Sequence, residues 1–110
     1  MNETTETFFT GTMSFEIKAD PRDNLPDDIQ RFLSKNEFFL RVSEYFPGIE
    51  YHVFKYNKEK YSIEIIVNIK PSVSVYIELR QINFDIEEAE FIKKMLPRTI
   101  KIVKKVTKML

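Results

Sequence analysis

Apolar and polar residues alternate near the start of the chain. From Phe9 to Ala19 every second residue is apolar or small, and the residues between them are mostly polar. This is the period-two pattern of a strand with one face buried and one face in water. The predicted strand ends near Asp20-Pro21, because proline cannot continue a ladder of backbone hydrogen bonds. The polar and acidic residues 1–7 are expected to form a flexible lead-in.

Two short helices are predicted after this strand. Pro26 suits the first turn of a helix, where its missing N–H costs nothing. The apolar residues on one face of this helix are Ile29, Phe32 and Leu33. Ser34 and Glu37 have the spacing of a capping box and predict a second helix, which Pro47-Gly48 would end. The buried side of the second helix would carry Phe38 or Phe39, Val42, and Tyr45 or Phe46.

Three strands are predicted next. The first runs from Ile49 to Tyr56, the second from Tyr61 to Ile69, and the third over residues 72–82 after the break at Pro71. The loop over residues 57–60 is short enough for a hairpin. Consecutive strands joined by short loops favour an antiparallel meander.

A long amphipathic helix is predicted from Asp85 to Leu110. Asp85 can cap it, with Glu88 at the matching position of a capping box. Acidic residues gather at its start and lysines at its end, which matches the helix dipole. Pro97 should kink the helix or split it. The predicted apolar stripe is Ile92, Leu96, Ile100, Val103 and Leu110.

Length and composition narrow the class of protein. The 110 residues predict one domain, and 43% hydrophobic with 31% charged residues is ordinary for a globular protein. Lys+Arg and Asp+Glu are equal at 17, so no net field attracts nucleic acid. The sequence shows no apolar run long enough to span a bilayer, no secretory start and no cysteine. We therefore expect a cytoplasmic protein without a membrane span; few glycines and abundant Ile, Lys and Glu are typical of thermophiles.

No residue cluster indicates a reaction. The single histidine, His52, has no metal-ligand partner or nucleophile at a recognisable spacing, so we expect a structural role. The pair Asp27-Asp28 is explained by the dipole of a helix start. Glu64 and Glu78 are expected on the wet faces of their strands, paired with basic residues. Phosphate-loop, nucleophile-elbow and zinc-helix motifs are missing, so we predict a non-enzyme with no catalytic residue, metal or cofactor.

The aromatic residues are more informative. Ten Phe and five Tyr are many for this length. Those on the strand faces predicted to be buried are Phe9, Phe15, Tyr51 and Tyr61. Buried tyrosines need partners for their hydroxyls, and an apolar cavity with a few polar tips would supply them. The strand face predicted to be exposed carries Phe54, Tyr56, Ile66 and Tyr76. These residues would form an apolar patch suited to self-association.

Three segments resemble the START-like proteins, the helix-grip superfamily of polyketide cyclases, the birch-pollen allergen type and lipid-transfer domains. They are Phe9 to Asp20, Ile29 to Ser34, and Phe46 to Ile49. The resemblance implies a curved antiparallel sheet laid against a long C-terminal helix. It is closest to the short members from thermoacidophilic archaea, because this chain has fewer strands than typical members. The superfamily shares no catalytic motif, so the resemblance assigns no catalytic residue.

The sequence therefore predicts an α+β helix-grip domain in the order β-α-α-β-β-β-α. Its predicted function is binding of a small hydrophobic or lipid-like molecule between the sheet and the last helix, without catalysis. The predicted lining residues are Met13, Phe15, Phe39, Tyr51, Tyr61, Ile65, Val75, Ile77, Leu96 and Ile100. One alternative is a homodimeric interaction module. A less favoured alternative is nucleic-acid binding through the basic face of the last helix, namely Lys93, Lys94, Arg98, Lys101, Lys104, Lys105 and Lys108.

Overall fold

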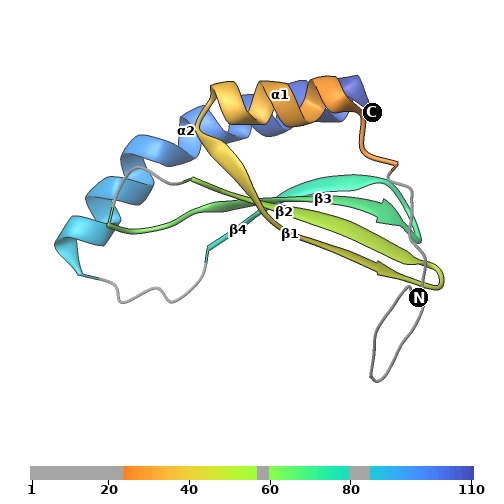
Figure 1. Cartoon of the computed structure of the whole chain (residues 1–110). Coiled ribbons are helices and arrows are strands. Elements are labelled where there is room, and N and C mark those ends of the chain that lie inside the picture. Colours follow the sequence, from red (N-terminus) through yellow and green to blue (C-terminus); the bar gives the residue numbers. More distant parts are fainter. Residues whose placement is uncertain (1–23, 57–59, 80–84) are drawn as a thin grey trace.

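Two helices lie on one face of a four-stranded antiparallel sheet in the computed structural model, which describes residues 24–56, 60–79 and 85–110 (Figure 1). The strand order is β1-β2-β3-β4. The elements are α1 (Asp27–Lys35), β1 (Phe38–Phe46), β2 (Ile49–Tyr56), β3 (Glu64–Lys70), β4 (Ser74–Glu78) and α2 (Ile86–Met109). This confirms the α+β class, the antiparallel sheet and the long C-terminal helix. The strand predicted over residues 9–19 lies outside the described residues.

Helix α1 forms as predicted, but the prediction of a second short helix after it is wrong. Pro26 is the N-cap of α1, and Ile29 and Leu33 are completely buried on its inner face. Glu37 then adopts a φ of 69°, a left-handed value at which neither a helix nor a strand continues. The segment after Glu37 is strand β1. Aromatic and β-branched residues dominate this strand, and the spacing of three to four residues that suggested a helix also occurs by chance in such a run.

A two-residue turn joins β1 to β2. Phe46 pairs with Ile49, so the turn consists of Pro47 and Gly48. Gly48 has a φ of 79°, the value that a type II turn requires at its second central residue, where glycine is the least strained choice. The Pro47-Gly48 pair therefore reverses a strand, where the sequence had predicted the end of a helix.

The remaining strands match the predicted meander with changed bounds. Strand β2 has the predicted bounds, Ile49 to Tyr56. Strand β3 begins at Glu64, later than predicted, and β4 spans only Ser74 to Glu78 of the segment predicted over 72–82. The described sheet therefore has one strand more than the three predicted after the helices, because β1 belongs to it.

Helix α2 begins where the sequence predicted. The Asp85 carboxylate accepts a hydrogen bond of 2.7 Å from the backbone N–H of Glu88, which caps the first turn. Pro97 lies inside the helix without splitting it, and the helix axis changes direction part-way along (Figure 1).

The face of α2 that packs on the sheet differs from the predicted stripe. Its buried residues are Glu88, Phe91, Met95, Thr99, Ile102 and Val106. The predicted residues Ile92, Leu96 and Val103 are half-buried at the border of this face, and Ile100 and Leu110 are exposed. Two neighbouring rows of the helix carry apolar residues. Spacing alone identifies a helix but does not decide which of two adjoining rows faces the sheet.

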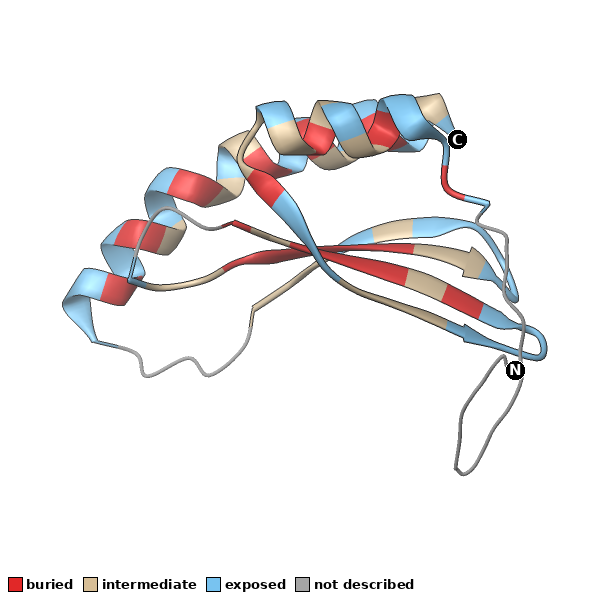
Figure 2. Cartoon of the chain, in the orientation of Figure 1, coloured by how far each residue is buried: buried red, intermediate tan, exposed pale blue. Residues whose placement is uncertain are grey.

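The core lies between the helices and the sheet face below them. Figure 2 shows buried positions recurring along the helices and on the central strands. The aromatic part of the core joins Phe38 and Tyr56, whose ring centroids are 5.6 Å apart, to Phe91 of α2, which is 6.1 Å from Tyr56. Fully buried aliphatic residues complete it, among them Ile29, Leu33, Ile63, Ile65, Val67 and Val106.

Arg98 of α2 contacts both the end of α1 and strand β2. Its guanidinium donates a hydrogen bond of 2.9 Å to the backbone carbonyl of Asn36, the C-cap residue of α1. The same group lies 5.7 Å from the ring centroid of Tyr56 on β2, within cation–π range. A cation at the carbonyl end of a helix also complements the helix dipole. Arg98, predicted to face solvent with the lysines of α2, is therefore half-buried and engaged within the fold.

Candidate functional site

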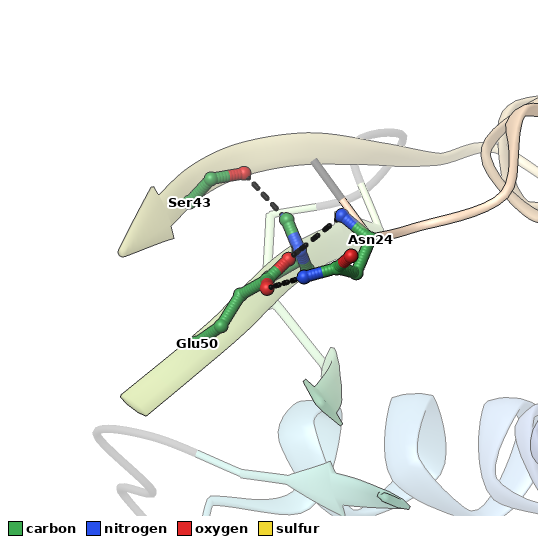
Figure 3. A network of polar contacts seen from close by, with 4 residues as sticks. Asn24, Ser43 and Glu50 are labelled. Carbon is green, nitrogen blue, oxygen red and sulfur yellow. Dashed lines mark hydrogen bonds and ion pairs between the residues drawn. The ribbon is translucent and has the colours of Figure 1, made fainter. Parts of the chain in front are cut away.

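A network of polar side chains, centred on the buried residues Glu50 and His52, connects the segment before α1 to the β1–β2 hairpin. It consists of Asn24, Ser43, Glu50 and His52 (Figure 3). Ser43 and His52 are paired across β1 and β2, and Glu50 precedes His52 by two residues on the same face of β2. The hairpin register therefore brings three of these four side chains together, and Asn24 joins them from the start of α1.

The network is held by short hydrogen bonds. The Glu50 carboxylate accepts from the Asn24 side-chain amide at 2.7 Å and from the Asn24 backbone N–H at 3.2 Å. His52 Nε2 lies 2.8 Å from Glu50 Oε2, and His52 Nδ1 lies 2.7 Å from Ser43 Oγ. Because a carboxylate only accepts hydrogen bonds, Nε2 carries a proton, and in the neutral ring Nδ1 accepts from the Ser43 hydroxyl.

Burial and hydrogen bonding act on Glu50 in opposite directions. Glu50 is 2% exposed and His52 is 1% exposed. Burial of the Glu50 carboxyl raises its pKa, but the hydrogen bonds from Asn24 and His52 together outweigh burial, so the pKa is lowered from its ordinary value of 4.5. The network thus holds a carboxylate that stays ionised in a buried position.

The order serine, histidine and carboxylate is also that of a hydrolase triad. A hydrolase additionally needs hydrogen-bond donors for an oxyanion and room for a substrate beside the serine. The pockets on α1 and beside Tyr61, described below, are lined by other side chains. The two hydrogen bonds from Asn24 to Glu50 link the segment before α1 to the β1–β2 hairpin, which agrees with the structural role expected of His52.

A pocket of about 410 Å³ lies at the junction of the sheet and the first half of α2. Its lining residues are Lys60, Tyr61, Glu87, Glu90, Phe91 and Lys94, and we call it the Tyr61 pocket. Its volume falls at the small end of the range of about 300–1,000 Å³ typical of small-molecule sites. The aromatic wall is formed by Tyr61 and Phe91, whose ring centroids are 6.0 Å apart.

Tyr61 is held at the rim by charged neighbours. Its single hydroxyl proton is shared between the carboxylates of Asp85 and Glu87, each with an oxygen 3.1 Å away. Partial desolvation and these two hydrogen bonds raise the pKa of Tyr61 to about 12. Lys60 Nζ lies 5.3 Å from the Tyr61 ring centroid and 3.6 Å from Glu87. The pocket thus combines an apolar aromatic wall with a rim of both charge signs.

The structure separates the other residues predicted to line a ligand site. Ile65 is fully buried in the core, and Val75, Ile77 and Leu96 pack half-buried against that core. Met13 and Phe15 lie outside the described residues. Tyr61 alone of the predicted set lines a described pocket, next to Phe91, which the sequence analysis did not select for the site.

Three of the predicted residues lie away from the interface between sheet and helices. Phe39 is 43% exposed and Ile100 is 40% exposed. Tyr51 alternates with Phe54 and Tyr56, which are in the core, and so lies on the opposite face of β2. The sequence analysis assigned the buried and the exposed face of β2 the wrong way round, because aromatic residues occupy both faces of this strand.

The prediction that Phe54, Tyr56, Ile66 and Tyr76 form one exposed patch is therefore wrong, because these residues lie on two faces of the sheet. Phe54 and Tyr56 belong to the core. Ile66 and Tyr76 face each other across β3 and β4 on the other side of the sheet, where Tyr76 is 49% exposed.

Glu64 shows a mixed outcome. It pairs with a basic residue as predicted, since Arg41 Nε lies 2.9 Å from its carboxylate. The wet face predicted for it is wrong, because Glu64 is only 3% exposed.

Comparison with known proteins gives no assignment: no family model matches the sequence, and neither a curated protein nor a solved structure is significantly similar. Across the described residues, no helix has the length and apolar character needed to cross a membrane. The same part of the chain holds no group of three or more histidine or acidic residues arranged to bind a metal ion.

Proposed function

We propose that this domain binds a small molecule with an apolar body and a charged end, and that the Tyr61 pocket receives it. The observation that carries the proposal is the aromatic wall of Tyr61 and Phe91 at the place where sheet and C-terminal helix meet. Burial of apolar ligand surface against this wall would supply the binding free energy, at about 25 cal/mol per Å² before the costs of binding.

The charged rim gives the ligand an orientation. Lys60 and Lys94 are cations that would attract a carboxylate or phosphate end, and Glu87, 3.6 Å from Lys60, and Glu90 offset part of that attraction. The rim is charged and the wall of Tyr61 and Phe91 is aromatic, so an amphipathic anion would place its charged end at the rim and its apolar body against the wall. A fatty acid or a similar amphipathic anion fits this arrangement.

The other described pocket is less suited to this role. It has a volume of about 500 Å³ and lies on α1. Its lining residues are Asp27, Gln30, Arg31, Ser34 and Lys35. All of them are polar or charged and come from a single helix, so they offer no facing apolar wall.

The proposed function agrees with the START-like resemblance, and we propose that kinship together with it. Members of that superfamily bind ligands between a sheet and a terminal helix, and the Tyr61 pocket lies between those same elements. Here the interior beneath α2 is occupied by fully buried side chains such as Ile65 and Val67. The proposed ligand therefore sits at the end of the interface, between the sheet and the N-terminal half of α2.

A nuclear magnetic resonance titration with decanoate tests this function. We expect amide shift changes concentrated at Tyr61, Phe91 and Lys94, with saturable binding. Tyr61→Ala removes half of the aromatic wall and should raise the Kd about tenfold, corresponding to about 1.4 kcal/mol.

The matched control is Tyr76→Ala, which removes a tyrosine from the far side of the sheet and should leave the Kd unchanged. Thermal unfolding of both variants checks that the fold is retained. A titration without saturable shifts, or equal weakening by the two variants, would contradict the proposal.

A further inference from the structure

Strand β1 lies at one edge of the described sheet and carries exposed apolar side chains. Among the described strands it pairs only with β2. Four of its large side chains are 42–56% exposed: Phe39, Leu40, Tyr45 and Phe46. Figure 2 shows exposed positions toward both ends of the strand. Within the described part of the chain, this edge presents backbone groups and apolar surface with which another strand can pair.

The side chains of β1 divide between the two faces of the sheet. Leu40 pairs with the core residue Phe54, and Ser43 with His52, so both point to the helix side. Tyr45 lies on that side too, since its ring centroid is 5.6 Å from that of His52. The other face carries Phe39, Arg41, Val42, Glu44 and Phe46.

A β-bulge interrupts the alternation. In the pairing with β2, Leu40 is opposite Phe54 and Val42 is opposite Val53, so Arg41 is the extra residue. The bulge places Arg41 and Val42 together on the face away from the helices. Any second strand that pairs with the outer edge of β1 must match this shifted pattern.

We propose that β1 pairs with β1 of a second copy of this chain, antiparallel and centred on Ser43. In this register Ser43 faces its own copy, and Glu44 faces the two bulged residues Arg41 and Val42. Beyond the bulge, Tyr45 faces Leu40 and Phe46 faces Phe39. Every pair then joins side chains on the same face of the sheet, which antiparallel pairing requires.

In this register, charged side chains of one copy face opposite charges of the other, and apolar side chains face apolar side chains. The Glu44 carboxylate meets the guanidinium of Arg41 from the other copy, twice by symmetry. The Arg41 side chain is 43% exposed, and its guanidinium has N–H groups left to donate beside the one facing Glu64. The four exposed apolar residues of each copy are covered in the same step. An interface with two-fold symmetry requires a surface that is complementary to itself. Strand β1 meets this requirement in the proposed register, which favours a second copy over an unrelated peptide.

Size-exclusion chromatography with light scattering tests the pairing on the full chain. The wild-type protein is expected to have the mass of two chains. Glu44→Lys replaces two attractive pairs by two repulsive ones and should raise the dimer Kd at least about tenfold. Val73→Lys is the control, because Val73 is 60% exposed but precedes β4 at the other edge of the described sheet. It should leave the dimer intact.

A disulfide tests the register. The chain has no cysteine, so Ser43→Cys introduces a single thiol at the proposed two-fold axis. Residues directly opposite in antiparallel strands are about 4.5–5.5 Å apart at Cα, which a disulfide can span. We expect mild oxidation to link two copies of Ser43→Cys but not two copies of Val73→Cys. A wild-type monomer at high concentration, or equal cross-linking of the two cysteine variants, would overturn the proposal.

Discussion

The buried network and the Tyr61 pocket both contain carboxylates that accept hydrogen bonds, but the first is shielded from water and the second is open to it. In the first, Glu50 accepts hydrogen bonds at 2% exposure. In the second, Asp85 and Glu87 accept from Tyr61 at a rim open to water. A buried charge that loses its partner has nothing to replace it, whereas water replaces a lost partner at a rim. Burial therefore decides which of two similar clusters stabilises the fold and which is available to a ligand.

The largest effect should come from breaking the buried network at its centre. His52→Ala removes the donor to Glu50 and the partner of Ser43, and leaves a carboxylate partly unsatisfied. We expect the free energy of unfolding to fall by about 3 kcal/mol, measured by urea denaturation at pH 7. A loss below about 1 kcal/mol would mean that water enters the site and that the contrast with the Tyr61 pocket is not real.

A smaller effect should follow from Glu50→Gln, which keeps the shape and removes the charge. We expect a loss of about 1–2 kcal/mol at pH 7. The lowered pKa of Glu50 fixes the sign of the pH dependence: the carboxylate stabilises the fold above its ordinary value of 4.5, and this contribution is lost as the pH falls through the folded-state pKa.

The difference in stability between wild type and Glu50→Gln should therefore shrink in acid. Urea denaturation of both proteins between pH 7 and acid pH measures it. A difference that stays constant over this range would contradict an ionised Glu50 in the folded protein.

The smallest effect should come from Tyr61→Phe at the pocket rim. This change removes both hydrogen bonds of the hydroxyl, yet we expect the thermal unfolding midpoint at pH 7 to stay the same, because water takes their place. In an alkaline absorbance titration, the wild type should show a tyrosine that ionises near pH 12, and Tyr61→Phe should lack it. A clear drop in the midpoint would show that the rim is as important to folding as the buried network.

The elements with local signals were predictable from the sequence. Asp85 and Glu88 marked the start of α2, and the helix begins there because the capping hydrogen bond involves only these neighbours. The bounds of β2 also followed from local pattern. Strand β1 was not predicted, because Phe38, Val42 and Tyr45 fit a helical spacing as well as a strand, and nothing local reveals the left-handed φ of Glu37.

The buried network was missed because its members come from three separate segments. One signal could have indicated it: reading Pro47-Gly48 as a hairpin turn pairs Phe46 with Ile49 and, by counting back, Ser43 with His52. Asn24 has no such signal, since its place depends on how α1 packs. The Tyr61 pocket was found in part, through Tyr61, but the wall residue Phe91 depends on which row of α2 faces the sheet.

The hydrogen bond from Arg98 to the carbonyl of Asn36 spans 62 residues of sequence. During synthesis α1 and β1 leave the ribosome before Arg98 does, so the carbonyl end of α1 is made 62 residues before its donor. A ribosome-bound chain that stops before Arg98 would contain α1 and the β1–β2 hairpin without this hydrogen bond. The native packing of α2 against the end of α1 therefore cannot form until a further 62 residues have been made.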